Sequence, residues 1–289
     1  MNIGRFVALL SIITVLGGCS DRGGSNGGQS VGQKRERDVN SERVMIEADL
    51  NVLGDKKHMQ YRIPKDAETL AILSSPGSSV SNITGLGQLP KVRKLILDLI
   101  NEIDPLAPKL PPSLATFREL EVLDLGGCTF RNLDFVDGFL GLRTLVLRDT
   151  EVRDEHNLDF TRLKSLEGVW LNGIRIQGQS IVKNGILEPA PNPLPFDAVF
   201  SPSVRILYLS SDQFPLHFAE GFFERNSDIA HIFILKESFE AGKNDVDLSK
   251  YPNVRLVTAQ DGSDTKLFIG RGEYYGDIVG DWRSYPTIN

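Results

Sequence analysis

Few residues in this chain belong to types that do chemistry, and their spacing matches no familiar catalytic or metal-binding motif. None of the four histidines lies in an H-E-x-x-H arrangement, and the two cysteines are too far apart to form a C-x-x-C pair for zinc. No G-x-S-x-G sequence is present, and Gly242-Lys243 has Glu237 where a phosphate-binding loop needs glycine. We therefore expect no catalytic residues, no metal site and no cofactor. A triad assembled only in space stays open as an alternative.

The charge balance bears on partners. The 289 residues include 32 basic and 38 acidic side chains, which gives a net charge of −6. No basic surplus is present to neutralise phosphates, so we expect no nucleic-acid partner. The 40% hydrophobic content excludes collagen, wholesale disorder and a multi-span membrane protein.

Cys19 is the one residue whose surroundings indicate a defined reaction. Arg5 precedes an apolar run from Phe6 to Leu16, which is too short to span a bilayer and is typical of a secretory signal. The run ends Leu16-Gly17-Gly18-Cys19, which resembles the lipobox of bacterial lipoproteins. The resemblance implies that residues 1–18 are cleaved off and that Cys19 carries the lipid, including an acyl group such as palmitate. Ser20, where a retention signal would be Asp, favours the outer membrane if the cell has one.

The following residues, 19–42, form a predicted tether. They contain only two aliphatic side chains, Val31 and Val39, and cannot bury enough apolar surface to fold. Random-coil scaling gives such a segment a reach of about 25 Å. Its basic residues can contact anionic headgroups, although a solvated linker is the alternative that we favour.

The rest of the chain repeats one pattern of apolar residues. Its clearest copy is Leu120-x-x-Leu123-x-Leu125-x-x-Cys128-x-Phe130. Further copies begin at residues 67, 92, 142, 166, 204, 229 and 251, so that six of the seven spacings are between 22 and 28 residues and one is 38. The alternating part of each copy predicts a short strand, and the apolar residues before it at steps of three predict a helical or 3₁₀ leg.

This pattern resembles the leucine-rich repeat, with its template L-x-x-L-x-L-x-x-N/C-x-L. The resemblance covers residues 67–260 and implies an α/β solenoid of about eight repeats, with a parallel sheet on the concave face and short helical or 3₁₀ legs on the convex side. The ninth position fits a common variant only at Cys128 and Thr150, so we expect an irregular solenoid. The long spacing contains a proline-rich insertion at 177–203, which we expect to form an edge loop.

Both ends of a repeat stack need covers, because the terminal repeats would otherwise expose core residues. Alternating apolar residues on both sides of Gly54-Asp55 predict a hairpin over residues 43–66 as the N-terminal cap. Residues 261–289, which carry aromatic side chains without repeat phase, are the predicted C-terminal cap.

The solvent-facing strand positions supply the candidate binding residues. Neighbouring parallel strands bring equivalent positions side by side, so Trp170, Tyr208 and Phe233 are expected to form an aromatic row. The other candidates on this face are Arg148, Ile206, His231 and Arg255. Exposed aromatic residues rimmed by polar groups are typical of binding anchors. The alternative, given equal weight, is that the rings cover one another or are covered by the insertion.

These observations predict a non-catalytic, monomeric, lipid-anchored cell-envelope protein that binds another protein or macromolecule through the concave face. The alternatives are a structural envelope scaffold, an enzyme with dispersed site residues, or an accessory subunit of an enzyme. We expect no disulfide, because Cys19 is the lipid anchor and Cys128 a buried thiol of the repeat.

Overall fold

The computed structural model describes residues 42–258, with gaps at 53–54, 74–77, 99–116, 118, 127–128, 131–132, 149, 153–156, 177–179, 184–185, 190–194 and 211–215. The predicted signal peptide, nearly all of the predicted tether, the predicted C-terminal cap at 261–289, Cys19 and Cys128 therefore lie outside the described residues. Within them, the fold is mixed α/β, with most strands in parallel sheets and few helices, as the sequence predicts.

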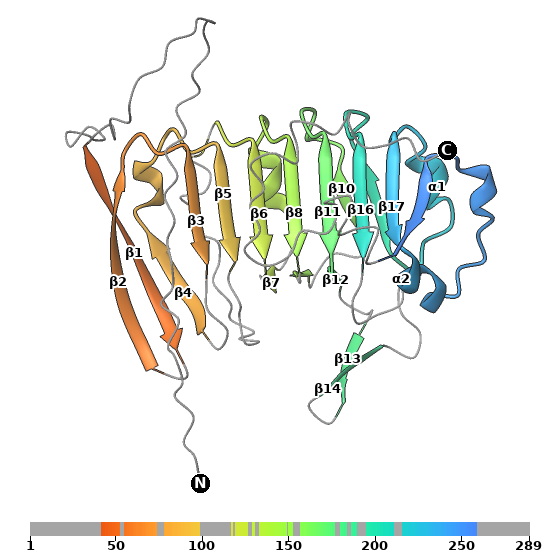
Figure 1. The fold of residues 1–289 in the computed structure, drawn as a ribbon, viewed down its shortest axis with the longest axis horizontal. Coiled ribbons are helices and arrows are strands. Elements are labelled where there is room, and N and C mark those ends of the chain that lie inside the picture. The colour runs from red at the N-terminus through yellow and green to blue at the C-terminus, as the bar shows by residue number, and fades with distance from the viewer. Residues whose placement is uncertain are drawn as a thin grey trace, which may run out of the picture.

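A parallel sheet of eight strands runs through the molecule (Figure 1). Its strands stand side by side in chain order, and each begins two or three residues after the start of one copy of the apolar pattern. The strands are β3 (Thr69–Leu73), β5 (Lys94–Asp98), β6 (Val122–Gly126), β8 (Thr144–Arg148), β11 (Gly168–Asn172), β16 (Ile206–Ser210), β17 (His231–Leu235) and β18 (Val254–Val257).

One face of this sheet packs against the main hydrophobic core. In the strands from β5 to β17, the second and fourth residues turn inward, as Leu145 and Leu147 do in β8, and are buried. Side chains alternate along a strand, so the first, third and fifth residues lie on the opposite face. Because these inward leucines, isoleucines and valines repeat from β5 to β17, each of these strands completes the core of its neighbours.

The connections between the strands lie on the core side and are more varied than the sequence predicts. The helical segments are η1 (Leu86–Gln88), η3 (Asp134–Gly138), α1 (Phe222–Arg225), α2 (Lys236–Ala241) and η4 (Leu248–Lys250). Short strands take part as well: β10 (Asn157–Phe160) pairs with β15 (Asp197–Phe200), and β7 (Thr129–Phe130), β9 (Glu151–Val152) and β12 (Arg175–Ile176) form a third sheet. Two of the connections therefore contain a strand where a helical leg was expected.

The N-terminal end of the sheet is flanked by an antiparallel unit. β1 (Arg43–Val52) pairs with β2 (Asp55–Pro64) over the range of the predicted hairpin, and with β4 (Ser78–Thr84) on its other side. Alternate residues of β1, including Val44, Ile46 and Ala48, are buried in the main core. The remaining strands, β13 (Ser180–Lys183) and β14 (Ile186–Pro189), form a hairpin within the insertion that projects from the strand ends (Figure 1).

Buried polar side chains tie neighbouring units together. The Thr150 hydroxyl, at the ninth pattern position, donates to the Leu125 carbonyl of the preceding unit at 2.8 Å. The Asn226 amide donates to the carbonyls of Ala198 and Phe222 at 2.9 and 2.8 Å. Its oxygen accepts from the backbone N–H of Phe200 at 3.4 Å. Asn226 therefore satisfies three backbone groups that burial would otherwise leave without partners.

Alternating charges line the edge at which the strands of the sheet begin. The residue before each of six successive strands carries a charge, in the order Glu68, Arg93, Glu121, Arg143, Glu167 and Arg205. The Arg143 guanidinium donates to both carboxylate oxygens of Glu167, with Nη2 2.9 and 2.8 Å from them, and Arg93 pairs with Glu121. We call these six residues the charge ladder. Each member has an opposite charge on both sides wherever it has two neighbours.

Candidate functional site

The predicted aromatic row is present in the sheet. Trp170 of β11 stands directly beside Tyr208 of β16, and Tyr208 stands beside Phe233 of β17. Val146 precedes the row on β8, and Arg255 follows it on β18. All of these residues occupy the fifth position of the apolar pattern, which explains why pattern phase alone places them together.

The row belongs to a second apolar cluster, separated from the main core by the sheet itself. We call the side of the sheet that carries it the aromatic face. Its buried members are Ala71, Ile96, Val146, Trp170, Ile206, Tyr208, Phe233 and Val257. The cluster therefore extends from β3 to β18 and has its largest side chains on β11, β16 and β17.

Of the two alternatives that the sequence left open, exposed rings and covered rings, the burial of the row agrees with covered rings. Trp170 has an exposed fraction of 1%, Tyr208 of 0% and Phe233 of 5%, and Ile206 is buried with them. Part of the reason is local. Gly168 precedes Trp170 on the same face, and a Cβ there would lie 2.4 Å from the Trp170 ring atom Cζ3. The indole thus lies over the space that a larger residue at 168 would fill, so that it is shielded on the side facing the sheet.

Three polar atoms on the aromatic face are buried without a hydrogen-bond partner among the described residues. They are the indole Nε1 of Trp170, the hydroxyl of Thr144 on β8 and the hydroxyl of Ser210 on β16. A buried polar group without a partner costs about 1–3 kcal/mol, so native proteins rarely keep several of them together. A further polar contact at this face could satisfy them.

Accessible polar residues lie at the β17–β18 end of the row. His231 stacks on Phe233 with ring centroids 5.9 Å apart, and both His231 and Arg255 are partly exposed. Burial lowers the pKa of His231, and the positive charge of Arg255 lowers that pKa further. The backbone of Arg148, the remaining candidate, pairs with Gly126 and Asn172, which puts it on the same face on β8, but its side chain is not among those described.

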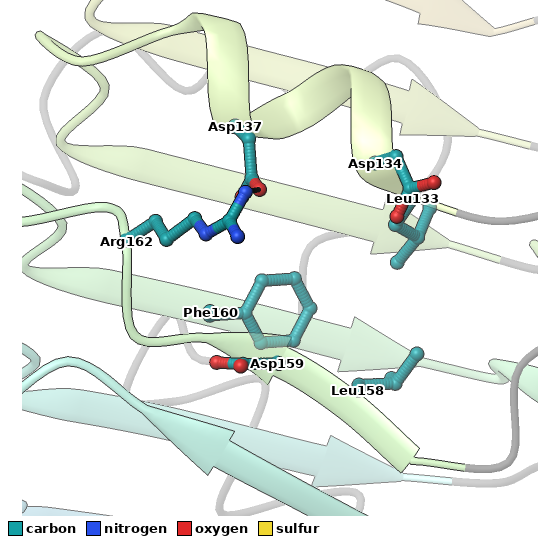
Figure 2. A pocket seen from close by; sticks show the side chains of 7 residues that line it. All are labelled: Leu133, Asp134, Asp137, Leu158, Asp159, Phe160 and Arg162. Carbon is teal, nitrogen blue, oxygen red and sulfur yellow. Dashed lines mark hydrogen bonds and ion pairs between the residues drawn. The ribbon is translucent and has the colours of Figure 1, made fainter.

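Two hollows lie away from the aromatic face. The smaller, of about 160 Å³, lies between η3 and β10 and is lined by three aspartates with Leu133, Leu158, Phe160 and Arg162 (Figure 2). Arg162 reaches across it to Asp137, 2.9 Å from the carboxylate, whereas Asp134 lies at the far side (Figure 2). This ion pair uses one of the carboxylates. No group of three or more histidine, cysteine or acidic side chains in the described part of the chain is placed to hold a metal ion.

The larger hollow, of about 490 Å³, lies around α1 and η4. Phe218, Phe222, Phe223 and Tyr251 form part of its wall and pack against one another, with ring centroids 5.0 to 5.2 Å apart. The Tyr251 hydroxyl donates to the Glu224 carboxylate, which lowers the pKa of Glu224 and raises that of Tyr251. These rings also pack on the main core, so they contribute to the stability of the fold.

Three residues that shape the aromatic face carry little signal in the sequence. Gly168, Thr144 and Ser210 are small residues at strand positions where the apolar pattern specifies no residue type. Their place on the aromatic face appears only once the register of the strands is known. The signal for Gly168 was its place two residues before a tryptophan on one strand, since both side chains then share a face.

Neither a protein-family model nor a curated protein matches this chain. Among the described residues, no helix has the length and apolar character needed to cross a membrane.

Proposed function

We propose that this chain is a lipid-anchored leucine-rich repeat protein that binds another macromolecule through the aromatic face. The observation that carries the proposal is the second apolar cluster, on the side of the sheet away from the main core. A fold of this kind needs only one core. The buried residues of the described helices, and those of the strands outside the main sheet, pack in the main core and not on the aromatic face. Large aromatic side chains gathered on the remaining face are suited to act as anchors for a partner.

The repeat assignment is supported by the chain order of the eight strands and by their agreement with the sequence pattern. It is also supported by Thr150, whose hydroxyl makes the inter-unit hydrogen bond expected at the ninth pattern position. We therefore propose that the sheet forms the binding surface of a solenoid, in which each repeat contributes one residue to the row that contains Trp170, Tyr208 and Phe233.

Attachment to the membrane is proposed to run through Cys19 after cleavage of residues 1–18. The lipid would hold the folded part at the surface of the cell envelope, with residues 19–42 as the spacer. Replacing Cys19→Ser should move the protein from the membrane to the soluble fraction and abolish labelling by radioactive palmitate. Unchanged membrane fractionation and labelling of that variant would refute the anchor.

The binding proposal is tested by affinity capture from detergent-solubilised envelope. If the face binds a partner, Trp170→Ala should weaken binding by about 2 kcal/mol or more, which is about 30-fold. Because that change also removes a buried ring, Arg255→Glu is the second variant, since it alters a partly exposed residue beside the row. Lys164→Glu, an exposed charge in the turn after β10, is the matched control. Equal capture by all four proteins would rule out this surface.

A further inference from the structure

A group of basic residues lies at one corner of the aromatic face, close to the starts of β16, β17 and β18. Arg205 immediately precedes Ile206 of the aromatic-face cluster, and its carbonyl accepts from the His231 backbone N–H at 2.9 Å. His231 stands beside Ile206, and Arg255 stands beside Phe233. Arg205 is exposed, and the other two basic residues are partly exposed. We call Arg205, His231 and Arg255 the basic corner.

The two arginines of the basic corner form no ion pair within the described part of the chain. Other arginines of the repeats do form one, namely Arg93, Arg143, Arg162 and Arg225. Arg205 is the last member of the charge ladder, because the residue before β17 is the uncharged Ala230. Its one neighbour in the ladder, Glu167, already accepts from Arg143 with both carboxylate oxygens. The positive charges of the corner are therefore available to another molecule.

The part of the aromatic face next to this corner carries no acidic side chain. From β11 to β18, the described strand residues on this face are aliphatic, aromatic, small or neutral polar residues, apart from His231 and Arg255. Burial and the charge of Arg255 lower the pKa of His231, and no carboxylate acts against them. The imidazole is therefore mainly neutral at pH 7 and offers an N–H group, while the arginines carry the charge.

A carboxylate carried by a protein segment is the group that complements this corner. The guanidinium group of arginine binds carboxylates through two parallel hydrogen bonds. Anionic membrane surfaces, by contrast, are bound by clusters of about four to eight basic residues, and the corner has two arginines. The net charge of −6 repels an acidic segment from most of the protein, so that the basic corner would orient it.

We propose that the partner docks on the aromatic face with an acidic segment, whose carboxylates pair with Arg205 and Arg255. This inference rests on the proposed function, because it assumes that the face binds a macromolecule, and it adds the chemistry of the bound segment. Two strand spacings, about 10 Å, separate the two arginines across the sheet, so one segment with two acidic residues reaches both.

The test is photo-crosslinking of the full chain in isolated envelope, with a benzophenone amino acid at position 233 beside Arg255. Replacing Arg205→Gln together with Arg255→Gln should lower the yield of the partner adduct by about fivefold, the sum of two exposed ion pairs. Replacing both by lysine keeps the charges and should keep most of the yield. Arg62→Gln, which alters an exposed arginine of β2, is the matched control and should change nothing.

Salt provides a readout that a purely structural role of the arginines would not move. Raising the salt concentration to about 0.5 M should lower the yield from the parent protein and leave that of the double glutamine variant nearly unchanged. Equal yields from the parent and the double glutamine variant would overturn the acidic segment while the binding face stands. The absence of an adduct from every protein, the parent included, would contradict the proposed function and this inference with it.

Sedimentation with vesicles separates an acidic protein segment from an anionic lipid surface. The Cys19→Ser chain, which lacks the predicted anchor, is mixed with vesicles of phosphatidylcholine and phosphatidylglycerol in equal parts. We expect it to stay in solution. Sedimentation that the double glutamine variant abolishes would assign the basic corner to lipid headgroups and overturn the proposal. Thermal unfolding shows whether each variant is folded.

Discussion

The indole of Trp170 fills the space above Gly168, where a Cβ atom would lie 2.4 Å from Cζ3 and 2.7 Å from Cη2. The two residues form one unit of the aromatic face, in which the absence of a side chain at one position accommodates the largest side chain at the next. Gly168 stands between Thr144 and Ile206 on the neighbouring strands.

The first prediction concerns this unit. Gly168→Ala should displace the indole and lower the free energy of unfolding by about 1–3 kcal/mol, the usual cost of overpacking. Urea unfolding followed by tryptophan fluorescence measures it. Gly138→Ala is the control, because a Cβ at Gly138 meets nothing within 4 Å. Equal stability of the two variants would contradict the packing described for Trp170.

The second prediction separates the charge ladder from an isolated ion pair. Exchanging the partners, Arg143→Glu with Glu167→Arg, keeps the pair but sets like charges beside Glu121 and Arg205. An isolated pair predicts recovery of stability in the double variant, whereas the ladder predicts none. We expect it to be less stable than wild type by about 0.5–1 kcal/mol in low salt, with the difference shrinking in 1 M salt.

The third prediction concerns Asn226, which is buried and bonds to three backbone groups. Asn226→Ala should lower the free energy of unfolding by about 3 kcal/mol, because it leaves the N–H of Phe200 and two carbonyl groups without hydrogen-bond partners. Asn244 makes an equivalent set of bonds, to Leu216, Phe239 and Phe218, but is only partly buried, so Asn244→Ala should cost less. A loss below 0.5 kcal/mol for Asn226→Ala in chemical denaturation would be at odds with this role.

The fourth prediction is a pH dependence of stability that comes from two histidines whose pKa values are shifted in opposite directions. The pKa of His231 is lowered by burial and by Arg255, so below about pH 6.5 the unfolded chain binds the proton more tightly and acid removes stability. The pKa of His58 is raised, chiefly by its hydrogen bond to Asp49. Its stabilising contribution is present below about pH 6.5 and is lost as the pH rises through its folded-state value.

Thermal unfolding at pH 5.5 and 7.5 therefore distinguishes the two residues. His231→Gln should reduce the loss of stability on acidification, and His58→Gln should increase it. A shift in the same direction for both variants would show that at least one assignment is incorrect.

The sequence predicts the strands of the sheet well because their determinants are local. The leucines at positions such as Leu145 and Leu147 set both the strand and its inward face. Equal phase in successive copies then fixes which residues stand side by side, so the neighbours Trp170, Tyr208 and Phe233 could be identified from the sequence alone. The parallel sheet is accordingly confirmed.

Properties that depend on distant segments could not be predicted in this way. The burial of Trp170 depends in part on the absence of a side chain at Gly168, which an apolar pattern does not encode. Asn226 and Asn244 lie outside the ninth pattern position, in the connections, where the pattern predicts no polar contact. The charge ladder is present in the sequence as alternating signs before six of the eight strands, but its meaning required the strand order.

The central claim, that the aromatic face binds a partner, is tested most directly by photo-crosslinking in the intact envelope. A benzophenone amino acid replaces Phe233 on the face and, as a control, Leu140, which has an exposed fraction of 71% and lies after η3. The account predicts a discrete adduct of higher mass from position 233 and none from position 140. No adduct from 233, or the same adduct from both positions, would contradict it.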